Sequence, residues 1–186
     1  FSQLLPGGRW LVFDELTSDN MGIERFSEQV LLHCAKSFPP KTSFEDIGDP
    51  AGQQRSQTDE KTVFQVLQAK GINIEGGEQT LALRLESIRK PLNTMLSGEP
   101  QFVLHPRCKT LRKGFQGGYH FRRMNTASER FTDQPEKNFT SHPMDALQYV
   151  ATRLFGDVLT SGKTGFDDPG WPSVGYGLDD RNSWGY

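Results

Sequence analysis

The 186-residue chain is long enough for one domain with a sizeable core, and it shows neither a signal peptide nor an apolar run of the about 18 residues that a membrane span needs. Its formal net charge of −2 excludes a general attraction to nucleic acid, so any DNA contact must come from a local basic patch. The two cysteines, Cys34 and Cys108, lack CxxC spacing, which indicates buried thiols in a reducing compartment rather than a disulfide or a zinc site.

The first predicted elements are a strand and a helix. Residues 10–16 are rich in aromatic and branched side chains and predict a strand, entered through Pro6-Gly7-Gly8. The polar residues 17–20 then supply caps for a helix that Pro39 ends. The apolar stripe of this helix consists of Ile23, Phe26, Val30, Leu31 and Cys34.

The middle of the chain predicts one short strand and two helices. Residues 44–48 form the strand, which ends at Asp49. Thr58 is expected to cap a helix that ends at Lys70-Gly71, with Asp59 and Glu60 in its first turn. The second helix should contain Pro91, which must kink or interrupt it. Its stripe has 4-3-4-3 spacing: Leu81, Leu85, Ile88, Leu92 and Met95.

The last third predicts a strand at 101–104, a basic helix or turn at 107–115 that ends at Gly117-Gly118, and a hairpin from 119–124 to a partner near Arg130. A helix at 143–156 closes the series. Strands interleaved with helices predict an α/β fold with a sheet covered on at least one face. Residues 161–186 lose periodicity and predict an irregular C-terminal tail, either disordered or packed on something else.

Two isolated acids are the candidate metal ligands. Asp49 follows a predicted strand, at the sheet edge where ligands bind in open α/β sheets, and carboxylate oxygens suit Mg²⁺. The alternative is an ordinary Asp-Pro turn. Pro143 fits the first helical position, which places Asp145 in the first turn, where the helix dipole favours an acid even without catalysis. Periodicity leaves open whether Asp145 faces solvent or the rim of a cleft.

A dense basic segment is the candidate DNA contact. No acid interrupts residues 105–123, and three aromatic residues are interleaved there. This composition suits contacts to phosphates, although a solvated basic face gives the same pattern. The predicted DNA-binding residues are Arg107, Lys109, Arg112, Lys113, Arg122 and Arg123. His142 precedes Asp145 and could cap its helix or approach a scissile phosphate.

Several short segments carry a family resemblance. The most specific joins Glu136-Lys-Asn138 to Ser141-His-Pro-Met-Asp-Ala-Leu-Gln-Tyr149, and Gly48-Asp-Pro-Ala-Gly52 is the next. Thr62-Val-Phe64, Gly71-Ile72 and Gly118-Tyr119 support them. Together, over residues 8–156, these segments resemble the nuclease domain of the large terminase subunit of tailed double-stranded DNA phages.

This resemblance implies an RNase H-like fold, with a mixed central sheet flanked by helices and with acids on two strands and the last helix. The family's middle acid corresponds to Asp49 and its final acid to Asp145, which implies that both are catalytic and bind Mg²⁺ or Mn²⁺. The family's first acid would fall upstream of Phe1. We therefore expect residues 1–160 to be an N-terminally truncated nuclease domain, with 161–186 as its tail. Asp14 or Glu15 could serve only in a secondary metal role.

The leading hypothesis is a divalent-metal endonuclease that cuts concatemeric phage DNA during genome packaging, by a two-metal reaction in the host cell cytoplasm. The implied partners are double-stranded DNA, portal or other packaging proteins, and an ATPase domain of the same full-length protein. No membrane contact is expected, and the fragment should be monomeric. Two alternatives stay open: another RNase H-like nuclease of resolvase or integrase type, and a non-catalytic fragment that binds DNA or a packaging partner.

Overall fold

The core forms where a small mixed sheet meets three helices. The structure, a computed structural model, describes residues 1–55, 61–124 and 130–160, without the side chains of 157–160. β1 (Ser2–Leu4) pairs antiparallel with β2 (Trp10–Val12), and β2 pairs in parallel with β7 (Phe102–Leu104). Because successive side chains of a strand point to opposite faces, Trp10 and Val12 share the buried face of β2.

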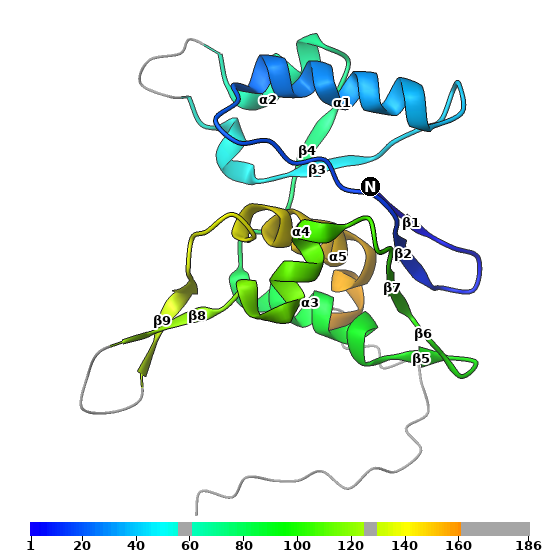
Figure 1. Cartoon of the computed structure of the whole chain (residues 1–186), viewed down its shortest axis with the longest axis vertical. Helices are drawn as coiled ribbons and strands as arrows, with labels where there is room; N and C mark the ends of the chain where they lie inside the picture. The colour runs from blue at the N-terminus through cyan, green and yellow to red at the C-terminus, as the bar shows by residue number, and fades with distance from the viewer. Residues whose placement is uncertain (56–60, 125–129, 161–186) are drawn as a thin grey trace, which may run out of the picture.

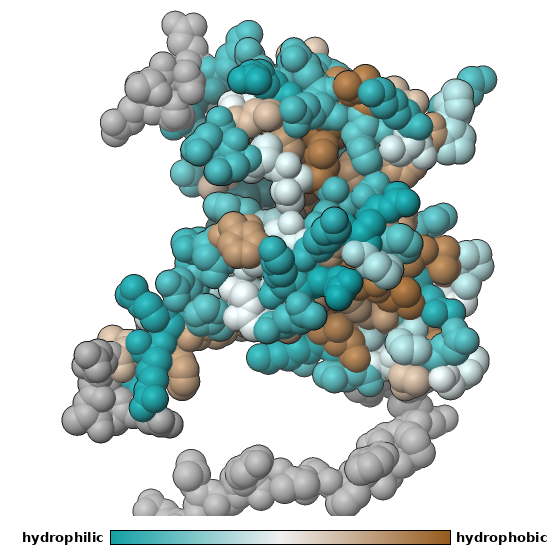
Figure 2. Space-filling view, viewed as in Figure 1, coloured by the Kyte–Doolittle hydropathy of each residue, from teal (hydrophilic) through white to brown (hydrophobic). Residues whose placement is uncertain are grey.

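Three helices cover this face: α3 (Leu81–Asn93), α4 (Lys109–Lys113) and α5 (Ser141–Thr160). All of them contribute to one apolar cluster, which also contains Cys108 at the start of α4. The buried members are Trp10, Val12, Ile88, Cys108, Leu111, Met144, Leu147, Ala151 and Phe155. In Figure 2, apolar side chains gather in the lower half of the molecule, around β7 and α3.

The predicted strand at 10–16 is confirmed only as far as Val12. The chain leaves the sheet there because Glu15 turns toward α4, where its carboxylate accepts the backbone N–H groups of Thr110 at 2.6 Å and Leu111 at 3.0 Å. These N–H groups at the start of a helix have no partner within the helix, so the carboxylate satisfies them. The Glu15 side chain therefore caps the N-terminus of α4, and Glu15 itself is not part of β2.

Helix α1 (Ile23–Ser37) forms as predicted and ends before Pro39. Its N-cap is Gly22, without a side-chain cap, so the expected capping by residues 17–20 is wrong. Leu31 is also wrongly placed on the buried stripe, because it is 40% exposed and Ser27 is the fully buried residue. The i, i+3, i+4 pattern through Ile23, Phe26 and Ser27 identifies the inward face.

A second, two-stranded sheet joins β3 (Asp46–Gly48) in parallel to β4 (Ile74–Gly76). Helix α2 (Val63–Ala69) connects them and starts later than predicted, because Thr62 and Gln65 form a reciprocal capping box. The predicted cap Thr58 and the acids Asp59 and Glu60 lie outside the described residues.

Helix α3 continues past Pro91 and ends at Asn93, so of the two expected effects of Pro91, a kink or an interruption, the interruption does not occur. Pro91 is fully buried and lies in the last turn of α3. Because it has no backbone N–H, the helix loses only the hydrogen bond to the carbonyl four residues earlier. The spacing of the apolar residues placed Met95 on this helix, but Met95 lies outside it. It begins β5 (Met95–Leu96), which pairs antiparallel with β6 (Glu99–Pro100).

The remaining elements agree with their patterns. One π-helical turn, η2 (Gly114–Gly118), follows α4 and ends where Gly117 adopts a φ of +109°. β8 (Phe121–Met124) pairs antiparallel with β9 (Arg130–Pro135) as the predicted hairpin. In Figure 1 this hairpin extends away from the molecule, while α1, α2 and β3–β4 form the upper half above α3, α4 and α5.

Both cysteines are free thiols, buried at Cys108 and half-buried at Cys34, as their spacing indicated. Among the described residues, none of the helices has the length and apolar character needed to cross a membrane. The predicted tail at 161–186 lies outside the described residues.

Candidate functional site

Asp145 is held by three side chains from different elements. Its Oδ1 accepts hydrogen bonds from Arg84 at 3.3 Å and from the Tyr119 hydroxyl at 3.1 Å, and its Oδ2 accepts one from Lys137 at 3.0 Å. Only 14% of its side chain is exposed. Asp145 is therefore not on an open surface but at the bottom of a polar junction between α3, α5 and the base of the hairpin.

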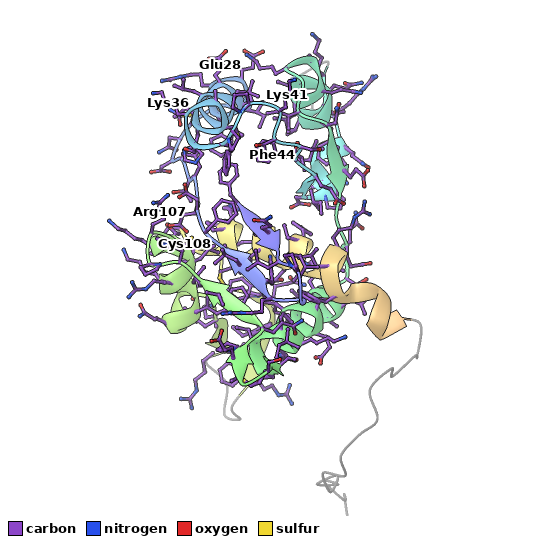
Figure 3. The ribbon with its side chains drawn as sticks, turned by 90° about the vertical axis from the view of Figure 1, so that its right-hand side faces the viewer. Glu28, Lys36, Lys41, Phe44, Arg107 and Cys108 are labelled. Atoms are coloured by element: carbon purple, nitrogen blue, oxygen red, sulfur yellow. The ribbon has the colours of Figure 1, made fainter. Side chains whose placement is uncertain are left out.

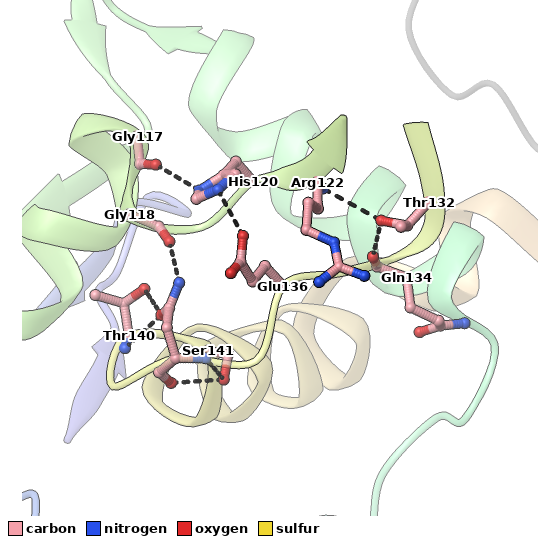
Figure 4. A network of polar contacts seen from close by, with 10 residues as sticks. Gly117, Gly118, His120, Arg122, Thr132, Gln134, Glu136, Thr140 and Ser141 are labelled. Carbon is pink, nitrogen blue, oxygen red and sulfur yellow. Dashed lines mark hydrogen bonds and ion pairs between the residues drawn. The ribbon is translucent and has the colours of Figure 1, made fainter. Parts of the chain in front are cut away.

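The expected place of Asp145 in the first turn is wrong, because α5 begins at Ser141, two residues before Pro143. The earlier start comes from Asn138, whose Oδ1 accepts from the Thr140 backbone at 2.9 Å and from the Thr140 hydroxyl at 2.7 Å. The Asn138 amide also donates to the Gly118 carbonyl at 2.8 Å (Figure 4). One side chain thus fixes both the start of α5 and the backbone before Tyr119. His142 is already helical and does not cap α5.

Asp49 follows β3 as predicted and is exposed. Its Oδ1 accepts the Ala51 backbone N–H at 2.9 Å, and it is the N-cap of the 3₁₀ turn η1 (Pro50–Gln53). The ordinary Asp-Pro turn is therefore present. This turn uses Oδ1 of the carboxylate.

Tyr149 connects the two acids. It lies one turn after Asp145 on α5, and the Arg84 guanidinium carbon is 4.8 Å from its ring centroid. Burial raises the pKa of the Tyr149 phenol, Arg84 opposes the rise, and both Asp49 and Asp145 add to it. Tyr149 also lies against Gly77, whose backbone N–H donates to the Gly48 carbonyl, directly before Asp49, at 2.9 Å. The packing of α5 on this segment places Tyr149 near the turn that carries Asp49.

Tyr119 is the other perturbed phenol. Burial raises its pKa to about 12, the Gln148 amide opposes this, and the neighbouring Asp145 carboxylate adds to it. Tyr119 consequently keeps its proton at neutral pH and remains a hydrogen-bond donor to Asp145. An open pocket of about 420 Å³ lies beside Tyr149, between β4 and α5, so this side of the junction is accessible from solvent.

The donor chemistry suits one hard cation. Carboxylate oxygens are the ligands that Mg²⁺ and Mn²⁺ prefer, and an ion that keeps several waters needs one or two of them. In the part of the chain that the structure describes, no three His, Cys, Asp or Glu side chains form a group that could hold a metal ion. Asp49 and Asp145 supply oxygen donors of the kind that such an ion accepts, and a two-ion centre requires a further acid.

The predicted DNA-binding residues lie on two surfaces. Arg107, Lys109, Arg112 and Lys113 are exposed on and before α4, whereas Arg122 and Arg123 are exposed on β8. Arg107 also forms an ion pair with Asp14 at 3.6 Å, and Lys113 lies over the Phe139 ring at 5.4 Å. The basic segment is thus split between α4 and the hairpin.

Asp14 and Glu15, the candidates for a secondary metal role, both have structural contacts. Asp14 is 8% exposed and pairs with His33 at 3.1 Å, while Glu15 begins α4. Phe1 and Phe38 pack against His33, and Phe44 packs edge-on against both phenylalanines. Figure 3 shows this aromatic region between α1 and β2, with Phe44 labelled.

Arg84, Lys137 and Tyr119 were not predicted from the sequence as partners of Asp145. Arg84 could have been, because it lies three residues after Leu81 and four before Ile88, on the apolar stripe of α3. A buried arginine needs a partner, and its presence on such a stripe predicts an acid nearby.

Comparisons with known proteins agree with this geometry at the level of the fold. The crystal structure of the large terminase nuclease domain from bacteriophage SPP1, solved with bound Mn, superposes with a TM-score of 0.51. The two chains share 19% sequence identity over 79% of this chain and 72% of the phage domain. The chain has the fold of a large-terminase nuclease domain.

This likeness confirms the expected RNase H-like α/β fold. The expected central sheet is divided here: the described strands pair as β1-β2-β7, β3-β4 and two hairpins. No protein-family model matches the chain. A search of curated proteins finds no match either.

Proposed function

We propose that this chain is a divalent-metal-dependent endonuclease domain of a large terminase, which cuts concatemeric double-stranded DNA during phage genome packaging. The observation that carries the proposal is the packing of α5 within a terminase-nuclease fold: Tyr149 lies one turn after Asp145 and against Gly77, which bonds to the residue before Asp49. The SPP1 domain was solved with bound Mn, which supports Mg²⁺ or Mn²⁺ as the ion here. The host cell cytoplasm is the proposed place of action, with portal proteins and an ATPase domain of the full-length protein as partners.

In this proposal, Asp49 and Asp145 hold the ion, which when bound lowers the pKa of an attacking water. Tyr119 and Arg84 fix the Asp145 carboxylate by donating to its Oδ1. Lys137 is exposed and can contact a phosphate oxygen of the substrate. The two-metal reaction needs one more acid, and we propose that the family's first acid, upstream of Phe1, completes the site.

Duplex DNA would lie over the basic surfaces of α4 and the hairpin. Contacts to phosphates position a duplex without reading its sequence, so we expect little sequence discrimination. Arg112 and Arg122, one on each surface, are exposed and can contact DNA phosphates.

The decisive experiment measures plasmid nicking with Mg²⁺ or Mn²⁺, in a chain extended by the family's first strand. Asp49→Asn and Asp145→Asn should each lower the rate by at least about 100-fold, because each removes a charged ligand of the ion. Asp19→Asn, an exposed acid outside the site, is the matched control. Full cleavage by either site variant, with circular dichroism unchanged, contradicts the assignment.

A second candidate is a non-catalytic fragment that only binds DNA. It is favoured by the occupation of Asp145 by Arg84 and Lys137, and by the absence of a three-ligand group among the described residues. Salt-sensitive duplex binding, without cleavage in the extended chain at any Mn²⁺ concentration, would support this candidate.

A further inference from the structure

Asp145 has more positive charge around it than a metal ligand ordinarily has. One carboxylate faces the Arg84 guanidinium at 3.3 Å and the Lys137 ammonium at 3.0 Å, and the Tyr119 hydroxyl donates to it as well. Both carboxylate oxygens are therefore already bonded. A divalent cation approaching Asp145 meets two positive side chains at the distance where Coulomb repulsion between partly buried charges is large.

The two cations differ in their freedom to move. The Arg84 side chain is only 10% exposed, lies over Tyr149 and has its Nε buried with no hydrogen-bond partner among the described residues. Its charge is consequently fixed in the site. The Lys137 side chain is 69% exposed on the segment between β9 and α5, so it can turn toward another anion at little cost.

We propose that Arg84 is a positioning residue that keeps Asp145 neutralised while no DNA is bound, so that the site binds a divalent cation more tightly when a phosphodiester is also bound. A phosphate brings the negative charge that offsets Arg84, and it draws Lys137 away from Oδ2, which becomes free for the cation. Cation and DNA then strengthen each other's binding by the same factor, as linkage requires. This inference rests on the proposed function, because it assumes that Asp145 is a ligand of the ion.

The test is Mn²⁺ binding, measured from the electron paramagnetic resonance signal of free Mn²⁺, with and without a short blunt duplex. Mn²⁺ bound by duplex alone, and by duplex with the Asp145→Asn variant, is measured as the background. In the unaltered chain the duplex should tighten Mn²⁺ binding by about ten-fold, within the usual range of coupling between sites. Arg84→Gln should tighten binding about ten-fold without DNA and lose most of the gain from the duplex, whereas Arg84→Lys, which keeps the charge, should behave as the unaltered chain.

A variant that loses its fold binds Mn²⁺ more weakly. Tighter Mn²⁺ binding by Arg84→Gln would therefore show that Arg84 opposes the cation and does not merely stabilise the fold. Lys137→Gln changes an exposed residue and should also tighten Mn²⁺ binding without DNA, by a smaller factor than Arg84→Gln. If Arg84→Gln does not fold, the Mn²⁺ affinity of Lys137→Gln tests the inference. The inference is overturned if the folded variants bind Mn²⁺ no tighter than the unaltered chain while Asp145→Asn still abolishes binding. If no variant binds Mn²⁺ above background even with duplex, the proposed nuclease function itself fails.

Discussion

Gly77 sets the position of the aromatic ring between the two acids. A Cβ at this residue would lie 2.6 Å from the Tyr149 Cδ1 and 2.9 Å from its Cβ, and both are closer than real side chains approach. The Gly77 backbone N–H also donates to the Gly48 carbonyl at 2.9 Å, directly before Asp49. A residue without a side chain thus allows α5 to pack against the end of β3.

Gly77→Ala should destabilise the fold by about 1–3 kcal/mol, because the new methyl group forces Tyr149 or the backbone to move. Urea unfolding measures the free-energy difference. Gly22→Ala is the uncrowded comparison, since a Cβ there meets nothing within 4 Å and its φ of −67° suits any residue; it measures only the cost of replacing glycine by alanine at an N-cap. Equal stability of the two variants would show that Tyr149 is not packed on Gly77.

At the scale of elements, the site depends on where α5 begins. Asn138 holds Thr140 with its carbonyl oxygen and Gly118 with its amide nitrogen, so it joins the helix start to the segment that carries Tyr119. Figure 4 shows this contact beside the His120–Glu136 pair that links the base of the hairpin. The helix start and the hairpin are therefore one connected polar structure.

Asn138→Ala should cost about 0.5–2 kcal/mol, the usual range for losing a side chain that satisfies the start of a helix. It should also weaken Mn²⁺-dependent nicking, because Tyr119 loses its fixed position beside Asp145. Asn73→Ala, an exposed asparagine before β4, is the control. Unchanged unfolding and nicking in Asn138→Ala would contradict this role.

At the scale of the whole molecule, α5 joins the upper and lower halves. Its buried face belongs to the lower core, whereas Arg153 on the same helix forms ion pairs with Glu45 and Glu75 of the upper half. The basic surfaces are separate from this junction. In Figure 3, Arg107 lies beside α4, and Lys36 is on α1 in the other half.

This distribution predicts a local dependence of DNA binding on charge. Arg112→Gln and Arg122→Gln should each weaken duplex binding about equally for all sequences, and each should reduce the slope of log affinity against log salt by about 1, because one phosphate contact is lost. Fluorescence anisotropy at several salt concentrations measures both quantities. Lys36→Gln, the control, should change neither, and a drop equal to that of Arg112→Gln would indicate non-specific attraction.

The local features could be predicted from the amino-acid sequence: the α/β order of elements, the Gly117 stop, the hairpin and the place of Asp49 directly after β3. These follow from periodicity and backbone preference over a few residues. The predictions were wrong where another residue made a competing contact. Glu15 caps α4 and does not extend β2, and Thr62, not Thr58, caps α2.

The surroundings of the two acids depend on contacts between distant parts of the chain. Arg84 reaches Asp145 across 61 positions of sequence, and Asp49 meets Tyr149 from another element altogether. Contacts of this kind depend on how α3, α5 and β3 pack together, and no spacing along the chain encodes that packing. The charge balance of the site, two cations and a phenol on one carboxylate, is therefore a property of the folded molecule alone.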